Sequence, residues 1–451
     1  MEKEELHKSK QLNVWMLTAL VTGTMIGSGI FTLPSNLAAF GTISILAWIF
    51  TAAGAVLLAY IFAKLSVLIP KAGGPYAYCR EAWGDFIGFE VAYNYWIALC
   101  VGNAAIVVTC VGYLAEFFPI LNQHAWLAFG IKASFIWLIT IINLFGVRNA
   151  SILQIVTVVL KLLPLFIIGL VGIFFIKPHH YHTFNISHQS NLSALGTTAT
   201  LTLWSFIGLE AATVPDGQTT NKNSIAKGTM IGTLVAASVN ILCIVVIMGL
   251  IPVKNLAHST APFTDAAKLL FPGYAQFMGG IITLGAIVAC LGTLNSSILL
   301  QAQVARASAG DQLFPRLFAK ENRYGAPALG LIISGLFITL LLLLTVNDGL
   351  LHQFQMMILM ATLASLIPYL FTALGAIMLT KKYRHQFTTS EHSRMIIIAG
   401  VASVYSLWAI LSSGFDILLY GGILSVLGIP IYLKMRYIPS EKHTSVSQSL
   451  A

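Results

Sequence analysis

The sequence is poor in charge: only 41 of its 451 residues are charged, 25 Lys or Arg and 16 Asp or Glu. That is 9%, against about 25% in a soluble domain of ordinary composition. This deficit excludes a soluble enzyme, a disordered chain and a nucleic-acid-binding protein. The sequence is rich instead in apolar residues, 57% of the total, and runs of about 20 of them match the length of a membrane-spanning helix. We therefore predict an all-α polytopic membrane protein.

Cysteine is also scarce, and its pattern predicts neither a disulfide framework nor a metal site. The five residues are scattered, four of them within apolar runs: Cys79, Cys100, Cys110, Cys243 and Cys290. We expect no metal and no cofactor. The charged N-terminal residues lead into a long apolar segment without a small-residue cleavage site, so we expect that segment to be an uncleaved span rather than a signal peptide.

About twelve apolar segments qualify as spans by their length and flanking charges. They are expected near 13–38, 42–69, 85–115, 125–146, 151–176, 195–215, 226–252, 276–304, 327–346, 353–379, 394–413 and 415–433.

The positions of Lys and Arg predict the orientation. With the N-terminus inside, 20 of the 25 fall in cytoplasmic segments, Lys177, Lys254 and Lys268 fall outside, and Lys132 and Lys161 fall within spans. This asymmetry follows the positive-inside rule, and a missed span would invert every later loop. We therefore expect an even number of spans, both termini in the cytoplasm and a location in the inner (plasma) membrane. Lys132, near the start of its span, is interpreted as a residue that snorkels to the interface or as a residue at a misplaced span boundary.

Two spans are interrupted at matching places. The first contains TMIGSGIF at 24–31, and the sixth contains LWSFIGLEAA at 203–212, where Gly208 lies next to Glu210. Backbone freed inside a bilayer is tolerated only where it lines a cavity or is buried in protein. Packing of the small residues against a neighbouring helix is the alternative. Ser28 and Gly208 are 180 residues apart, which is five spans, and this spacing indicates inverted repeats.

The expected organisation follows from these repeats. It comprises a cytoplasmic N-terminal tail (1–12), a first inverted repeat with spans one to five (13–176), an extracellular loop (177–194), a second repeat with spans six to ten (195–380), two further spans (381–433) and a cytoplasmic C-terminal tail (434–451).

Broken helices can bind a zwitterion. An unwound helix exposes N–H groups where its second half begins and C=O groups where its first half ends, and these ends carry about +0.5 and −0.5 charge. We expect N–H groups near Ser28 and Gly29 to bind a carboxylate. Carbonyls near 204–207 would bind an ammonium group.

At these residues the chain resembles the amino acid–polyamine–organocation superfamily of permeases. Within it, the chain is most similar to the basic amino acid/polyamine antiporters, which include arginine/agmatine antiporters. The resemblance covers essentially the whole chain and implies a five-plus-five inverted-repeat fold with two extra C-terminal helices, usually as a homodimer. It rests on GTMIGSGIFTLPSNLA at 23–38, PKAGGPYAYCREAWG at 70–84, GNAAIVVTCVGYL at 102–114, LWSFIGLEAATV at 203–214, MGLIP at 248–252, PFTDAA at 262–267 and the stretch 290–315.

The resemblance also implies roles for individual residues. It places Met25, Ser28 and Gly29 at the substrate carboxylate, Trp204, Ser205 and Ile207 at the amine and over the substrate, Asn103 at the side-chain end, Tyr76 and Tyr95 as aromatic gates, and Glu210 as a gating carboxylate. A buried carboxyl that merely holds the broken helix is the alternative for Glu210.

Two positions depart from the antiporter pattern. Ser297 stands where the antiporters have a tryptophan that stacks on the cationic head of the substrate, a cation–π contact of about 0.5–2 kcal/mol. Ile106, beside Asn103, is also uncharged. These departures argue against arginine or agmatine and favour a smaller or neutral amino acid.

Lys161 lies in the apolar run VVLKLLP. An intramembrane lysine costs about 2.5–3.5 kcal/mol on insertion scales and is functional by default, although snorkelling is an alternative. In the resembling family, proton-coupled members carry a lysine here where sodium-coupled members bind sodium. The residue is therefore a candidate proton carrier.

The first functional hypothesis is a secondary active amino acid transporter, not an enzyme, which exchanges one amino acid for another or for an amine by alternating access. The alternative is a proton-coupled symporter that uses Lys161. A third hypothesis, from another class, is a non-transporting amino acid sensor, which the lack of a sizeable cytosolic output domain disfavours. The expected partners are the amino acid or amine, protons in the symport case, membrane lipids and a second copy of the chain, but no nucleic acid.

Overall fold

The computed structural model describes residues 13–71, 73–145, 157, 160–214 and 222–437. Within these ranges the chain is helical and contains no strand. The α-helices are α2 (Val14–Met25), α3 (Ser28–Ala38), α4 (Ile43–Leu68), α5 (Pro75–Trp83), α6 (Asp85–Leu114), α7 (Ala125–Leu144), α9 (Asn191–Leu203), α10 (Lys222–Leu250), α11 (Val253–Leu256), α12 (Pro262–Leu270), α13 (Ala275–Gly310), α14 (Ala328–Leu344), α15 (Leu350–Lys382), α16 (Thr389–Leu411), α17 (Phe415–Val426) and α18 (Gly428–Tyr437).

The helices confirm the prediction of an all-α polytopic membrane protein. In the described part of the chain, nine helices are long and apolar enough to cross a membrane. Two shorter apolar helices, Leu160–Phe175 and Ala328–Leu344, occupy the places of the fifth and ninth predicted spans. The sixth is the broken segment that begins with α9, while 151–156, part of the predicted fifth span, lies outside the described residues. The division into two repeats stays a prediction.

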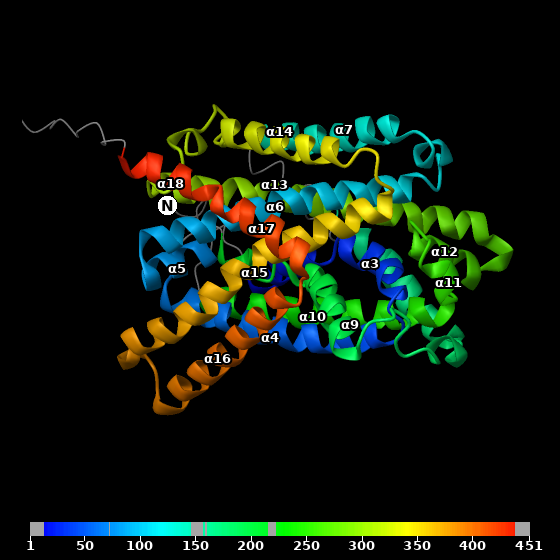
Figure 1. The fold of residues 1–451 in the computed structure, drawn as a ribbon, viewed down its shortest axis with the longest axis horizontal. Coiled ribbons are helices and arrows are strands. Elements are labelled where there is room, and N and C mark those ends of the chain that lie inside the picture. The colour runs from blue at the N-terminus through cyan, green and yellow to red at the C-terminus, as the bar shows by residue number, and fades with distance from the viewer. Residues whose placement is uncertain (1–12, 72, 146–156, 158–159, 215–221, 438–451) are drawn as a thin grey trace, which may run out of the picture.

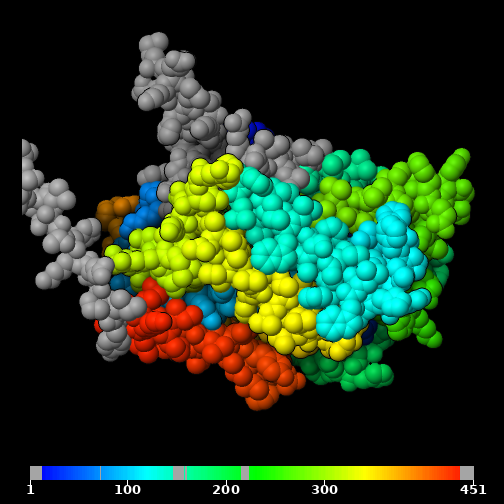
Figure 2. Space-filling model, turned by 90° about the horizontal axis from the view of Figure 1, so that it is seen from above, coloured from blue at the N-terminus to red at the C-terminus, as the bar shows by residue number. Residues whose placement is uncertain are grey.

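The core is built around α6, which packs against both α13 and α15. Almost every residue of α6 from Gly88 to Tyr113 is buried, because this helix has neighbours on all sides. In Figure 1, α7 and α14 lie along one side of the α6–α13 pair, and α4 and α16 lie on the other. Figure 2 shows α7 and α14 covering the first of these faces, with α17 and α18 in red along one edge.

The two ends of the bundle carry different short helices. α5 and α18 lie at one end in Figure 1, and α11 and α12 lie at the other. The first is the end predicted to be cytoplasmic, since α5 belongs to the loop at 70–84 and α18 precedes the C-terminal tail. We refer to these as the predicted cytoplasmic and extracellular ends.

The interpretation of Lys132 as a snorkelling residue is wrong. Its side chain is 1% exposed, and Nζ donates to Gln353 Oε1 at 2.6 Å. Gln353 in turn donates to the carbonyls of Thr345 and Asp348 in the turn between α14 and α15. The sequence placed Lys132 correctly on a span but could not show that this face of α7 meets protein instead of lipid.

Candidate functional site

The first interruption is a two-residue break between α2 and α3. α2 ends at Met25, Ile26 is extended, and α3 begins at Ser28 with no side chain capping its N-terminus. A Cβ at Gly27 would lie 2.6 Å from Thr293 Cγ2, so only glycine fits this approach to α13. The break therefore leaves the first N–H groups of α3 without a side-chain acceptor.

The second interruption follows α9. The helix ends at Leu203, a 3₁₀ turn covers Trp204–Phe206, Ile207 is extended and Gly208 has φ +103°. That φ lies in the left-handed region, which glycine adopts without strain. The Thr24 hydroxyl donates to the Gly208 carbonyl at 3.3 Å. The same hydroxyl lies 2.9 Å from the Leu20 and Val21 carbonyls of its own helix. The two breaks, far apart in sequence, are thus in direct contact.

Trp204 lies across both interruptions. Its indole Nε1 donates to Ser28 Oγ at 3.3 Å, and its ring packs against Gly102, where a Cβ would lie 2.7 Å from Cη2. Gly29 faces Ser205 and Trp204 so closely that a Cβ there would overlap them. The small residues of α3 and α6 therefore make the room that the indole occupies.

A cavity of about 40 Å³ lies between the two breaks. That volume holds about three water molecules. Because an amino acid has more non-hydrogen atoms than that, the site is contracted in this conformation. Its described lining contains no charged side chain. The lining is Thr24, Met25, Gly27, Ser28, Gly29, Ala98, Leu99, Gly102, Ile106, Trp204, Ile207, Gly208, Thr293, Ser297 and Leu300.

Seven of the predicted substrate residues line this cavity, whereas Ser205 and Asn103 do not. Ser205 is buried next to it, and its hydroxyl has no hydrogen-bond partner among the described residues. Asn103 is fully buried and donates to Gln301 Oε1 at 2.9 Å, so it faces α13. Gln301, one helical turn after Ser297, was not predicted; only its i, i+4 spacing from Ser297 could have indicated it.

Glu210 lies just beyond the second break and is fully buried. The hydroxyl of Tyr95 on α6 donates to Oε1, and the hydroxyl of Tyr369 on α15 donates to Oε2 at 2.6 Å. This cluster joins three segments between the cavity and the predicted cytoplasmic end. Tyr95 and Glu210 were predicted to be gating residues, whereas Tyr369 was missed, because one tyrosine in an apolar span carries no distinctive signal.

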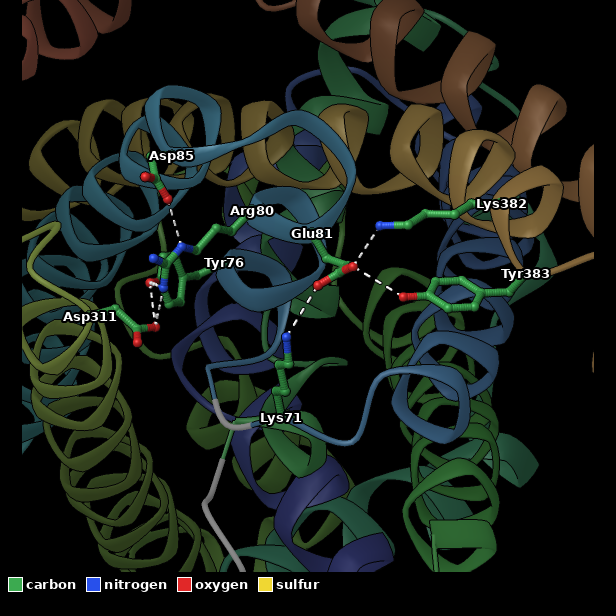
Figure 3. Close-up of polar contacts among 8 residues, drawn as sticks. All are labelled: Lys71, Tyr76, Arg80, Glu81, Asp85, Asp311, Lys382 and Tyr383. Atoms are coloured by element: carbon green, nitrogen blue, oxygen red, sulfur yellow. Dashed lines mark hydrogen bonds and ion pairs between the residues drawn. The ribbon is translucent and has the colours of Figure 1, made fainter.

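A second polar layer fastens α5 to its neighbours, as Figure 3 shows. The predicted gate Tyr76 donates to Asp311 Oδ2 at 2.7 Å, and Arg80 pairs with both Asp311 and Asp85 at 2.8 Å. Burial raises the pKa of Tyr76 above its ordinary value, and the hydrogen bond to Asp311 adds to this effect. Because Asp311 caps the end of α13, the cluster holds α5 against α13.

Glu81, on the other side of α5, pairs with Lys382 at 2.7 Å and with Lys71 at 3.1 Å (Figure 3). The Tyr383 hydroxyl also donates to Glu81. Hydrogen bonds from Lys382 and Lys71 lower the pKa of Glu81 to about 2. α5 is therefore held to the end of α15 as well, and the predicted cytoplasmic end is closed by two successive layers.

Lys161 is fully buried and reaches the first break. Its Nζ donates to the carbonyl of Gly23 and lies 3.5 Å from Thr293 Oγ1. Thr293 in turn donates to the carbonyl of Ile26 at 3.2 Å. The lysine does not snorkel; it is coupled to the end of α2 where the helix is interrupted.

Comparison with known proteins identifies the family. The family model for amino acid permeases matches residues 12–420. The putrescine transporter PotE of Haemophilus influenzae is 32% identical over 94% of this chain and 97% of its own. The arginine/ornithine antiporter of Pseudomonas aeruginosa is 31% identical over 95% of this chain and 92% of its own. The cadaverine/lysine antiporter of Escherichia coli is 33% identical over 75% of this chain and 76% of its own.

These relatives are transporters, not enzymes, and they confirm the resemblance drawn from the sequence. The structure agrees with this assignment. Two broken helices face a common cavity, a buried carboxylate lies beside it, and the family model matches most of the chain. The chain belongs to the amino acid permease family.

Proposed function

We propose that this protein exchanges an amino acid for another amino acid or an amine across the plasma membrane by alternating access. The observation that carries the proposal is the pair of interrupted helices facing one cavity, with two polar layers between that cavity and the predicted cytoplasmic end. Opening those layers while the opposite end closes would release the substrate to the other side.

The helix ends supply the binding chemistry. The N-terminus of α3 has no side-chain cap, so its N–H groups at Ser28 and Gly29 are available to a carboxylate. The 3₁₀ turn at Trp204–Phe206 and the extended Ile207 offer carbonyls to an ammonium group. One site thus recognises the zwitterion common to amino acids, and the walls select among side chains.

The walls favour a short, uncharged side chain. Ile106, Leu99, Leu300 and Ser297 line the cavity, and Ser297 cannot stack on a guanidinium group. The relatives are named for putrescine, arginine, ornithine, cadaverine and lysine. We propose that the zwitterion site is retained here and that the preference for a cationic end is weaker.

Proton coupling through Lys161 is a second candidate function. The observation that favours it is the contact of this buried ammonium group with the Gly23 carbonyl and, through Thr293, with the break at Ile26. Loss of its proton would weaken a contact that holds the end of α2. A proton taken up on one side could then bias the conformational equilibrium, which is what symport requires.

Flux measurements in liposomes separate these candidates. Purified protein is reconstituted, and uptake of labelled alanine, serine, ornithine, arginine and putrescine is measured with and without the same unlabelled compound inside. We expect uptake to depend on internal substrate. Uptake driven by an imposed pH gradient into empty liposomes would support symport instead. Binding without flux in either format would favour a sensor and overturn the exchange proposal.

Two further proposals concern the orientation of the chain in the membrane and its oligomeric state. We propose that both termini face the cytoplasm and that two copies associate in the membrane. The large exposed apolar side chains of α16 and α17, such as Val404, Leu411 and Phe415, suit either lipid or a second copy. Cysteine cross-linking at these positions in native membranes distinguishes the two, because only a dimer gives a cross-linked product.

A further inference from the structure

Tyr113 lies near the C-terminal end of α6 and bonds to two other elements. Its side chain is fully buried. The hydroxyl donates to the carbonyl of Phe31 in α3 at 2.8 Å and accepts the backbone N–H of Phe263 in α12 at 3.3 Å. One hydroxyl therefore links the second half of the broken first span to a helix at the predicted extracellular end.

Three aromatic rings surround this link. The Phe31 ring packs edge-on against Tyr113, with centroids 5.7 Å apart, and lies 5.0 Å from the ring of Phe263. All three side chains are fully buried. The link is thus protected from water, and any movement of α12 relative to α3 must break both the ring contacts and the hydrogen bonds.

α12 itself is fixed to the outer ends of α6 and α13. Thr264 and Thr283 share a hydroxyl hydrogen bond of 2.7 Å, and Lys268 pairs with Glu116, just after α6, at 2.7 Å. The Thr260 carbonyl approaches Gly112 so closely that a Cβ there would lie 3.3 Å from it. α12 therefore forms an outer cap on α6 and α13, and its inner end touches α3 through Phe263.

α3 is well suited to transmit this contact to the substrate site. Phe31 lies one helical turn after Ser28, whose N–H group begins the helix. Pro34 lacks the N–H that would bond to the Ile30 carbonyl one turn earlier, and the Tyr113 hydroxyl donates to the next carbonyl along the helix, that of Phe31. The position of Phe31 fixes that of Ser28 because the two belong to one short rigid helix.

We propose that Tyr113 is a positioning residue through which the outer cap α12 sets the place of α3, and with it the N–H groups that bind the substrate carboxylate. The proposal rests on the proposed function of that site. It concerns the hydroxyl, because the ring alone could be explained by packing.

The test uses Tyr113→Phe, which removes the hydroxyl and keeps the ring. In reconstituted liposomes we expect the KM for external substrate to rise about five- to tenfold, the effect of losing one or two hydrogen bonds, with a smaller change in maximal exchange rate. Tyr93→Phe is the matched control, since Tyr93 is a buried tyrosine on α6 that stacks on Phe89 at the opposite end of the helix. An unchanged KM in Tyr113→Phe would overturn the proposal.

A second readout does not require transport. Ser297→Cys places a thiol in the cavity, and the five native cysteines are buried. We expect a membrane-impermeant thiol reagent outside to modify this cysteine severalfold faster in Tyr113→Phe than in its parent, because the cap no longer holds α3. Thr264→Val, which removes the hydroxyl hydrogen bond between α12 and α13, is expected to act in the same direction. Equal modification rates of the cysteine in variant and parent would reject the role of Tyr113, whether or not any tested compound is transported. Altered modification rates without any flux would count only against the proposed function.

Discussion

The Tyr369 hydroxyl donates to Glu210 Oε2 at 2.6 Å, although the two residues are 159 positions apart. Tyr95 holds the other carboxylate oxygen. α15, α6 and the broken sixth span therefore meet at one buried carboxylate, and we predict that they separate when the cavity opens toward the predicted cytoplasmic end.

Tyr369→Phe is predicted to weaken that closure. A buried hydrogen bond contributes about 0.5–1.5 kcal/mol, so the equilibrium is expected to shift roughly two- to twelvefold toward the cytoplasm-open state. The measurement is modification of Ser297→Cys by a thiol reagent in inside-out vesicles. Tyr405→Phe, a buried tyrosine on α16, is the control. Equal modification rates in the two variants would contradict this prediction.

Gly29→Ala is predicted to weaken substrate binding. A Cβ at this position overlaps the Ser205 hydroxyl and lies 3.0 Å from Trp204 Cδ1, so the indole must move out of its place over Ser28. We expect at least a tenfold loss of affinity, measured by tryptophan fluorescence titration. Gly400→Ala on α16, where a Cβ meets open space, is expected to leave affinity unchanged. Equal affinities in both variants would refute the tight-packing argument.

Ser297→Trp is predicted to shift selectivity toward cationic substrates. Ser297 lines the cavity, and an indole there would restore a cation–π contact worth about two- to thirtyfold in affinity. The measurement is the ratio of inhibition constants for arginine and alanine in an exchange assay, since a ratio is insensitive to a general loss of activity. An unchanged ratio would count against the stacking argument.

Lys161→Ala is predicted to leave substrate binding intact and to abolish the pH dependence of transport. The lysine contacts the Gly23 carbonyl and Thr293 and does not line the cavity. Uptake is measured from pH 5 to 8. Lys132→Met serves as the matched control, because Lys132 is equally buried but bonds to Gln353. Persistence of the pH dependence in Lys161→Ala would exclude a coupling role.

Glu81→Gln is predicted to destabilise the protein in a pH-dependent way. Lys382 and Lys71 lower the pKa of Glu81 from 4.5 to about 2, so the ionised form is stabilised in the folded state. This contribution is fully present above pH 4.5 and is lost as the pH falls toward 2. The melting temperature in detergent is expected to differ between wild type and variant at pH 5 to 8, and the difference is expected to shrink below pH 4.5. A constant difference at all pH values would contradict the assignment.

The sequence predicted where the helices and their interruptions lie better than it predicted which residues of different helices contact one another. The breaks near Ser28 and Gly208 were predictable because glycine and polar residues interrupt runs that are otherwise apolar. The burial of Lys132 was not, because it depends on which face of α7 meets α15. Tyr369 and Gln301 were missed for the same reason, since their partners come from segments 159 and 198 residues away.

The hydrogen bond from Thr24 to the Gly208 carbonyl has a mechanical consequence. Together with the close packing of Thr24 against Gly208, it places the two interruptions in direct contact, so bending of one broken helix displaces the other. A carboxylate bound at the first interruption and an ammonium group bound at the second would act on both broken helices at once. A substrate that carries only one of these groups would act on one broken helix alone. This gives a physical reason why the site would recognise the carboxylate and the ammonium group of an amino acid together.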